Sequence, residues 1–262
     1  GNISVRGVLN QIEVTHNVSL QLDGVDDYAE IPGVSLNDKS FTIEFWMKRE
    51  LGTEGTIFTK GAGSDKVEVY FSADGNVEFR LGNGALAVDA SPVYNATYPE
   101  DAWRHWYFNY DQDMAVASVY ADDQELNTGS IDFNSQPTET AYLGANSGTI
   151  LAAQVHEVRI WEKALTLAES VLNMNQTLTG SEFSLYGYWP MDEAVGNAAL
   201  DLASSRHMTT SGTWLVEPGG YAFDFNDIGS EAQHLALDGT KVVIDGKTDM
   251  TVEFWFKAGV AC

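Results

Sequence analysis

The sequence stretch from Phe41 to Lys48 reads FTIEFWMK and returns at Met250 to Lys257 as MTVEFWFK. In both copies apolar residues alternate with Thr, Glu, Trp and Lys, which is the period of a β-strand with one buried face. Two stretches this similar, placed far apart in one chain, indicate a repeated structural module. The sequence therefore predicts a sheet strand used twice, a second module that begins before residue 262, and a parent protein longer than this chain.

Short strand patterns bounded by turn residues fill most of the chain up to Trp161. Asp23-Gly24 and Asp74-Gly75 separate alternating apolar runs, as the turns of β-hairpins do. Asp122-Asp123 separates two further runs, and a turn this tight requires Asp to adopt a left-handed backbone. Strands of this length and spacing predict an all-β sandwich or barrel.

A single helix is expected after these strands. Thr166 and Glu169 form the pattern of a capping box ahead of Ala168 to Met174, in which each residue satisfies a backbone N–H at the helix start. The helix pattern follows directly on the strand pattern of Gln154 to Trp161. We therefore expect one short helix to close the first module.

The strands, the helix and the repeat together predict three segments. Residues 1–17 carry apolar residues without a clear period and are expected to be a linker or a borrowed edge strand. Residues 18–180 are predicted to form the first module. Residues 181–262 are predicted to begin a second, truncated module, because the LDG of Leu22 to Gly24 recurs at Leu237 to Gly239. The YWPMDE segment could belong to either module.

The net charge of the chain limits the classes of partner that it can bind. Thirty-eight acidic residues against 14 basic ones give a net charge of −24, which disfavours nucleic acid and anionic membrane surfaces. No apolar run approaches membrane-spanning length, so membrane insertion is not expected. The acidity fits either bound divalent cations or solubility in a salty medium. The one cysteine, Cys262, excludes an intrachain disulfide and a cysteine-rich metal site.

Several phrases resemble the laminin G-like, concanavalin A-like jelly-roll modules that occur in tandem in large secreted proteins. The matching phrases, in the order of the family, are LDGVDDYAEIP, FTIEFWMK, WRHWYF, VYADDQEL, YLGAN, HEVRIWEKALTLAE and YGYWPMDEAVG. The resemblance implies a concanavalin A-like lectin/glucanase sandwich of two antiparallel sheets, in an extracellular or cell-surface protein. Family members bind sugars, bind proteins or serve only as spacers, so the fold alone does not select a ligand.

A calcium site is one candidate. Asp23, Asp26 and Asp27 offer three carboxylates within five residues, and calcium prefers such hard oxygen ligands. The family usually has Asp immediately before the Glu of EVRIW, whereas this chain has His156, a poor calcium ligand. A surviving site would then be completed by backbone oxygens or by Glu157. The alternative is that the acidic loop only turns the chain.

Aromatic side chains could form a ligand-binding surface by stacking on sugar rings. The candidates are Trp46 and its repeat Trp255 on the polar face of the repeated strand, together with Trp103 and Trp161. The alternative is that Trp46 and Trp161 pack beneath the second sheet or the closing helix, because large aromatics dominate sandwich cores.

A catalytic function has less support in the sequence than a binding function. The array of alternating acids that glycosidases of this type of sandwich carry on one strand, E-x-D-x-x-E, does not occur in the sequence. Gln154-Val155-His156 resembles a strand of alginate-lyase-like jelly rolls, and Phe256 to Gly259 resembles another, but the accompanying Arg-rich strand and Tyr are missing. We therefore expect a non-catalytic module for adhesion to a glycan or cell-surface protein, beside neighbouring modules of the same polypeptide. The alternatives are a polysaccharide lyase and a ligand-free spacer.

Overall fold

The computed structural model describes residues 18–83, 85–90, 101–134, 138–144 and 148–216, and the backbone of 234–237 and 240–243. The chain divides into two compact units, one formed by His16–Val216 and the other by Gly1–Thr15 together with Glu217–Cys262. In the latter unit the structure describes one antiparallel pair, β17 (His234–Leu237) with β18 (Thr240–Val243). The repeated strand at Met250 to Lys257 lies outside the described residues.

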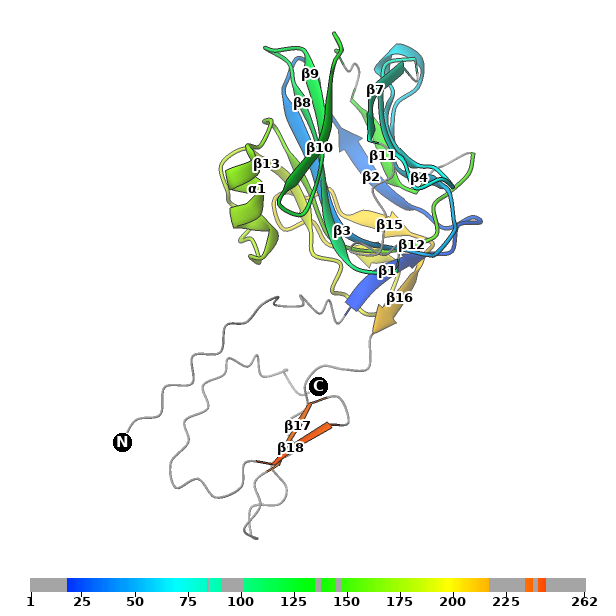
Figure 1. The fold of residues 1–262 in the computed structure, drawn as a ribbon, viewed down its shortest axis with the longest axis vertical. Coiled ribbons are helices and arrows are strands. Elements are labelled where there is room, and N and C mark those ends of the chain that lie inside the picture. The colour runs from blue at the N-terminus through cyan, green and yellow to red at the C-terminus, as the bar shows by residue number, and fades with distance from the viewer. Residues whose placement is uncertain are drawn as a thin grey trace, which may run out of the picture. The chain divides into compact units, whose positions relative to one another are not determined.

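The unit His16–Val216 is a sandwich of two antiparallel sheets (Figure 1). In the first, sheet A, the strand order is β10-β9-β8-β3-β12-β1-β16, and β13 also pairs with β12. Its strands are β1 (Val18–Leu22), β3 (Phe41–Arg49), β8 (Arg104–Asp111), β9 (Val116–Ala121), β10 (Gln124–Ser130), β12 (Ala153–Trp161), β13 (Leu185–Trp189) and β16 (Thr213–Val216).

In the second sheet, sheet B, the order is β14-β15-β2-β11-β4-β5-β6-β7. Its strands are β2 (Ala29–Val34), β4 (Gly55–Lys60), β5 (Val67–Phe71), β6 (Val77–Leu81), β7 (Ala85–Ala90), β11 (Glu139–Leu143), β14 (Ala198–Ala199) and β15 (Met208–Thr210), and a 3₁₀ turn, η1, covers Gly63–Asp65. The predicted all-β sandwich of two antiparallel sheets is thereby confirmed. Two predicted hairpin turns also have the expected backbone, with φ of +83° at Gly75 and +55° at Asp122.

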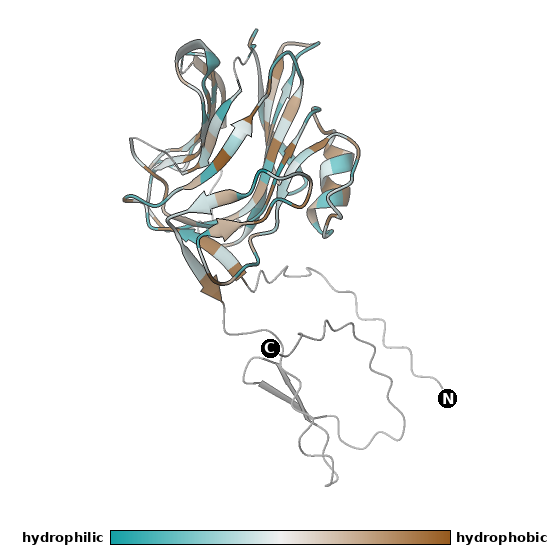
Figure 2. Ribbon diagram, turned by 180° about the vertical axis from the view of Figure 1, so that it is seen from behind, coloured by the Kyte–Doolittle hydropathy of each residue, from teal (hydrophilic) through white to brown (hydrophobic). Residues whose placement is uncertain are grey.

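The core lies between the sheets, where buried apolar side chains of both sheets form one hydrophobic cluster. Apolar and polar positions are interspersed along the strands (Figure 2). Phe41, Ile43 and Phe45 of β3 are fully buried, as are Val158 and Ile160 of β12. The two strands are direct neighbours, with Ile43 opposite Ile160. The predicted register of the repeated strand is therefore confirmed for its first copy.

The opposite face of β3 is buried as well, which the simple alternating pattern does not predict. Thr42 and Glu44 are fully buried and Trp46 is 9% exposed. The cover is helix α1 (Leu167–Met174), which lies against the outer face of sheet A (Figure 1). Its capping box is formed as predicted, because the Thr166 side chain accepts from Glu169 N–H and the Glu169 carboxylate accepts from Thr166 N–H.

The predicted domain boundary near residue 180 needs correction. Strand β13 pairs with β12, β15 pairs with β2, and β16 pairs with β1, so residues 185–216 complete both sheets of the first sandwich. The YWPMDE segment accordingly belongs to the first module. The boundary of the compact unit lies at Val216, 36 residues later than 180. The second module remains a prediction for the residues beyond it.

Candidate ligand-binding loop and the covered strand face

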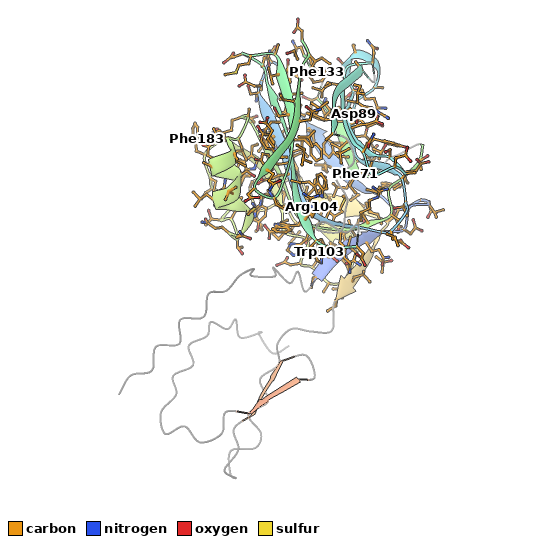
Figure 3. The ribbon with its side chains drawn as sticks, viewed as in Figure 1. Phe71, Asp89, Trp103, Arg104, Phe133 and Phe183 are labelled. Atoms are coloured by element: carbon orange, nitrogen blue, oxygen red, sulfur yellow. The ribbon has the colours of Figure 1, made fainter. Side chains whose placement is uncertain are left out.

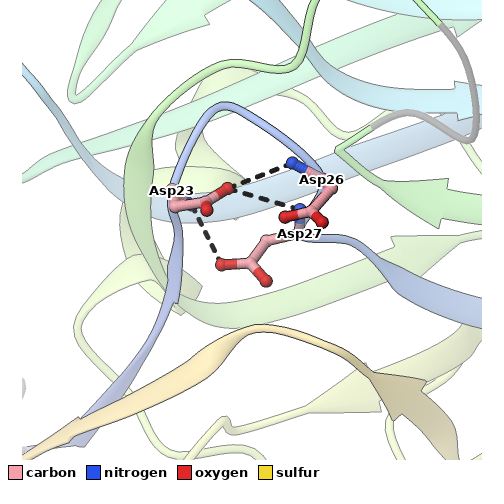
Figure 4. Close-up of side chains that lie close together, drawn as sticks. All are labelled: Asp23, Asp26 and Asp27. Atoms are coloured by element: carbon pink, nitrogen blue, oxygen red, sulfur yellow. Dashed lines mark hydrogen bonds between the residues drawn. The ribbon is translucent and has the colours of Figure 1, made fainter.

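The acidic loop connects β1 to β2 at the rim of the sandwich. The carboxylates of Asp23, Asp26 and Asp27 each place an oxygen within 4.8 Å of the others (Figure 4). Asp23 holds the loop together, since its Oδ1 accepts from the N–H groups of Val25, Asp26 and Asp27 at 2.8, 3.2 and 3.4 Å. Asp27 Oδ2 in turn accepts from Asp23 N–H at 3.1 Å. The predicted turn and the predicted carboxylate cluster thus occupy the same loop.

The pKa values of Asp23 and Asp27 are shifted in opposite directions. The backbone N–H of Val25, followed by those of Asp26 and Asp27, lowers the pKa of Asp23, which is fully exposed. Partial burial raises the pKa of Asp27, and the charges of Asp23 and Asp26 add to this rise. A cation would relieve this repulsion. The oxygen donors fit calcium, because Asp23 Oδ2 is not used within the loop and Asp26 adds a second exposed carboxylate.

Glu157 does not complete this cluster. It lies at a β-bulge of β12 with φ of +53°, where residues 157 and 158 stand opposite the single residue Phe45. Its Oε2 accepts from Arg159 Nη2 at 2.6 Å and its Oε1 accepts from Tyr188 Oη–H at 3.0 Å. The bulge turns Glu157 toward β13, so its assignment as a ligand beside Asp23 is wrong in this structure.

His156, the residue that departs from the family pattern, also lies away from the loop. Leu22, which directly precedes Asp23, pairs with Ala153, and His156 is three residues further along β12. Burial, together with the charge of Arg159, lowers the pKa of His156 to about 4. Its neighbour in the lyase-like triplet, Gln154, pairs with Lys48 on β3. The second lyase-like stretch, 256–259, lies outside the described residues.

Two of the four predicted stacking tryptophans are buried. Trp46 is 9% exposed and its Nε1–H donates to Met174 O at 3.0 Å, while Trp161 is 3% exposed and donates to Glu44 Oε1 at 2.9 Å. Neither can offer a ring face to a sugar, which corrects the prediction in favour of packing beneath the helix. Trp103 is partly exposed and directly precedes β8 (Figure 3). Trp255 lies outside the described residues.

The polar residues of the repeated strand instead form a buried network. Glu44 is fully buried and accepts from Arg159 Nη1 at 3.3 Å, and its other oxygen lies 3.3 Å from His105 Nε2. Arg159 also donates to Asn173 O and Gln176 O at 3.0 and 2.8 Å. These bonds, with that of Trp46, satisfy carbonyls at the end of α1, which has no basic residue in its last turn.

This network explains the lowered pKa of Glu44. Burial would raise its pKa, but the hydrogen bond from His105, the charge of Arg159 and the hydrogen bond from Trp161 lower it to about 2. In the first copy of the repeated strand, Trp46 therefore binds the end of the helix directly, and Glu44 binds it through Arg159. Sequence reasoning assigned the Trp to a ligand because the alternating pattern gives no sign that a helix covers this face.

A pair of tyrosines beside the acidic loop was missed. Tyr28, the residue after Asp27, meets Tyr142 of β11 edge to face, with ring centroids 5.9 Å apart, and both side chains are partly exposed. Tyr28 N–H donates to Ser211 Oγ at 2.9 Å, which fixes this part of the rim. The sequence signal was present in the phrase DDYAEIP, but Tyr142 joins it only through the pairing of β11 with β2.

Two antiparallel sheets with this strand order define the class of the protein as a concanavalin A-like sandwich. A laminin G family model described as the concanavalin A-like lectin/glucanases superfamily matches residues 23–169, more than half of the chain. The chain therefore belongs to this superfamily. Among curated protein sequences, none is significantly similar to it.

The chain is similar to several solved structures. A candidate carbohydrate-binding protein from Bacteroides ovatus ATCC 8483 is 17% identical with a TM-score of 0.59, over 76% of this chain and 60% of the other. A heptameric SAP-like pentraxin from Limulus polyphemus is 13% identical with a TM-score of 0.49, over 75% of this chain and 95% of the other. Domains LG4-5 of the mouse laminin alpha1 chain are 13% identical with a TM-score of 0.44, over 58% and 44%. At the first of these scores the similarity shows a shared fold.

Within the part of the chain that the structure describes, no helix has both the length and the apolar composition needed to cross a membrane.

Proposed function

We propose that the sandwich is a non-catalytic binding module of an extracellular protein, and that the rim around the acidic loop contacts a glycan or a cell-surface protein. The observation that carries this proposal is the placement of three clustered carboxylates beside the partly exposed Tyr28–Tyr142 pair. Calcium held by Asp23, Asp26 and Asp27 would supply a positive centre for hydroxyl or carboxylate oxygens of the ligand. The tyrosine rings supply apolar faces against which sugar C–H groups can pack.

Three glutamates on the strands are held in ion pairs, which supports binding rather than catalysis. Glu44 is paired with Arg159, and Glu68 and Glu78 both form ion pairs with Arg80. Retaining or inverting glycosidases need two carboxyl groups that face one substrate bond, one of them available as an acid. The cationic and hydrogen-bonding partners of Glu44 and Glu68 outweigh burial and lower their pKa values, so these two carboxylates are poorly suited to donate a proton.

A glycan array tests the proposal, with glycans as the first probe because the Bacteroides ovatus protein of this fold is named for carbohydrate binding. The full chain is applied in calcium and in chelator at equal ionic strength. Binding to at least one glycan class in calcium, weakened by Tyr142→Ala and unchanged by Tyr120→Ala on the other sheet, is the expected result. An array that stays blank in both conditions, together with no binding to cell-surface protein extracts, would contradict a binding role.

A further inference from the structure

The segment that follows α1 contains a candidate modification site. Its tripeptide Asn175-Gln176-Thr177 matches the acceptor pattern Asn-X-Ser/Thr for N-linked glycosylation. Matching triplets also begin at Asn2, Asn17 and Asn95, which lie outside the described residues. Such triplets are common in protein sequences, so the surroundings of Asn175 in the fold are what distinguish an acceptor from a chance match.

The side chain of Asn175 is exposed and has no other role among the described contacts. Asn175 ends α1 as its C-cap, with φ of −102° and ψ of 15°. Neither its amide nor the hydroxyl of Thr177, which is also exposed, forms a hydrogen bond with the part of the chain that the structure describes. An exposed asparagine with a structural role looks different. Asn127 on the β10 edge of sheet A donates through Nδ2 to Asp89 O on the β7 edge of sheet B, at 2.7 Å.

The backbone of the triplet, in contrast, is held firmly. Gln176 O accepts from Arg159 Nη2 at 2.8 Å, and Gln176 N–H donates to Asn173 O at 3.0 Å. Leu178, directly after the triplet, is only 6% exposed and packs in the small cluster around Trp161. The main chain is therefore anchored at both ends of the triplet, and a group attached to the exposed side chain displaces none of these contacts.

We infer that Asn175 is an acceptor for an N-linked glycan in a eukaryotic secretory route. The transfer forms a bond between Asn175 Nδ2 and the anomeric carbon of a lipid-pyrophosphate-linked oligosaccharide. The bond from that carbon to the pyrophosphate breaks, the lipid pyrophosphate leaves, and one Nδ2 proton passes to the transferase. Thr177 supplies the hydroxyl that the acceptor pattern requires two residues after the asparagine. The inference shares the extracellular location with the proposed function and does not depend on the ligand bound there.

A glycan at this position would cover an apolar part of α1. Ala168, Leu172 and Asn175 are four and three residues apart, so they lie on one face of the helix. Ala168 is exposed and Leu172 is 63% exposed. A bulky hydrophilic glycan shields such a surface. Because α1 covers sheet A whereas Tyr142 belongs to sheet B, the glycan leaves the proposed binding rim accessible.

The test is secretion of the full chain from mammalian cells behind an added signal peptide. N-glycans are then removed with peptide N-glycosidase in heavy-oxygen water, which converts each glycosylated asparagine to a labelled aspartate that tandem mass spectrometry assigns to its position. Label at position 175 in most chains is the expected result. Translation into microsomes gives the same readout if the chain is not exported. An Asn175 without label in both systems would overturn the inference.

Variants separate the acceptor pattern from the fold. Asn175→Gln and Thr177→Ala should abolish the label at position 175, and Thr177→Ser should restore it. Asn197→Gln is the matched control, because Asn197 is exposed but begins no such triplet, and the label at 175 should stay unchanged. Full label in Thr177→Ala would overturn the inference. A glycosylated chain that stays blank on the glycan array contradicts only the binding role, and a chain that binds glycans with Asn175 unmodified contradicts only this inference.

Discussion

Arg159 of β12 lies directly opposite Glu44 of β3, and the two side chains form an ion pair in which Glu44 is fully buried and Arg159 is 1% exposed. The pair does more than join two strands. Arg159 also binds carbonyl oxygens of Asn173 and Gln176, so the same guanidinium connects the sheet to the end of α1. This buried charge therefore contributes directly to the packing between sheet and helix.

Removing the guanidinium of Arg159 should lower the free energy of unfolding substantially. Arg159→Met leaves Glu44 buried with a much weaker set of partners, and a destabilisation of about 3–5 kcal/mol is expected in urea unfolding. Arg80→Met is the matched control, because Arg80 also pairs with two glutamates but its side chain is 27% exposed. Its loss should cost no more than about 1 kcal/mol. Equal losses for the two variants would show that burial does not set the value of the Glu44–Arg159 pair.

Stability should fall with acid in two separate ranges. The folded pKa of His156 is lowered from 6.5 to about 4, mainly by burial, so the unfolded chain binds a proton first and stability declines between pH 6.5 and 4. The loss over this range is at most roughly 3 kcal/mol. The folded pKa of Glu44 is lowered from 4.5 to about 2, so its contribution is present above pH 4.5 and is lost toward pH 2.

Unfolding in urea at pH 7 and pH 5 measures the His156 effect. The unaltered chain should lose stability between these values, and His156→Gln should lose less, because the amide does not titrate. His207→Gln is a suitable control on the same chain, since His207 lies on another part of the module, in the loop before β15. A pH dependence that is identical in His156→Gln would assign the loss to other groups.

Periodicity predicted the sandwich because each strand of the core has one face that must be apolar. Phe41, Ile43 and Phe45 are buried as that argument requires. The capping box at Thr166 and the turn at Asp122 could also be predicted, because each depends only on hydrogen bonds or backbone angles within a few residues. Such features can be recognised from the sequence without knowledge of the partners across the fold.

The errors arose where distant segments meet. A helix that follows β12 covers Trp46 and Trp161, and nothing in the period of β3 indicates this cover. Glu157 was suggested as a ligand because it follows the position of the family's Asp at His156, but at the β-bulge its carboxylate binds Arg159 and Tyr188 instead. The boundary at 180 was wrong because β13 to β16 are short strands whose places in the two sheets depend on pairing with β1, β2 and β12.

The contact between the two sheet edges gives a prediction about one glycine. Gly129→Ala would put its Cβ 2.0 Å from Ala87 O, and neither backbone can move without disturbing its sheet. A loss of about 1–3 kcal/mol in the free energy of unfolding is expected from such overpacking. Ser130→Ala, an exposed neighbour on β10, should change stability by less than about 0.5 kcal/mol. A neutral Gly129→Ala variant would mean that the edges of β7 and β10 do not touch in solution.

Calcium should stabilise the module if Asp23, Asp26 and Asp27 hold it. A ligand that binds only the folded chain adds about 2.7 kcal/mol at a concentration 100 times its Kd, which raises the Tm of a unit of this size by roughly 5–10 °C. Asp26→Asn is the informative variant, since Asp23 Oδ1 also holds three N–H groups of the loop and its loss would disturb the turn itself. Asp113→Asn removes the same charge from an exposed turn elsewhere and should keep the full calcium response. Melting curves that coincide in calcium and in chelator, at constant ionic strength, would leave the loop as a turn alone.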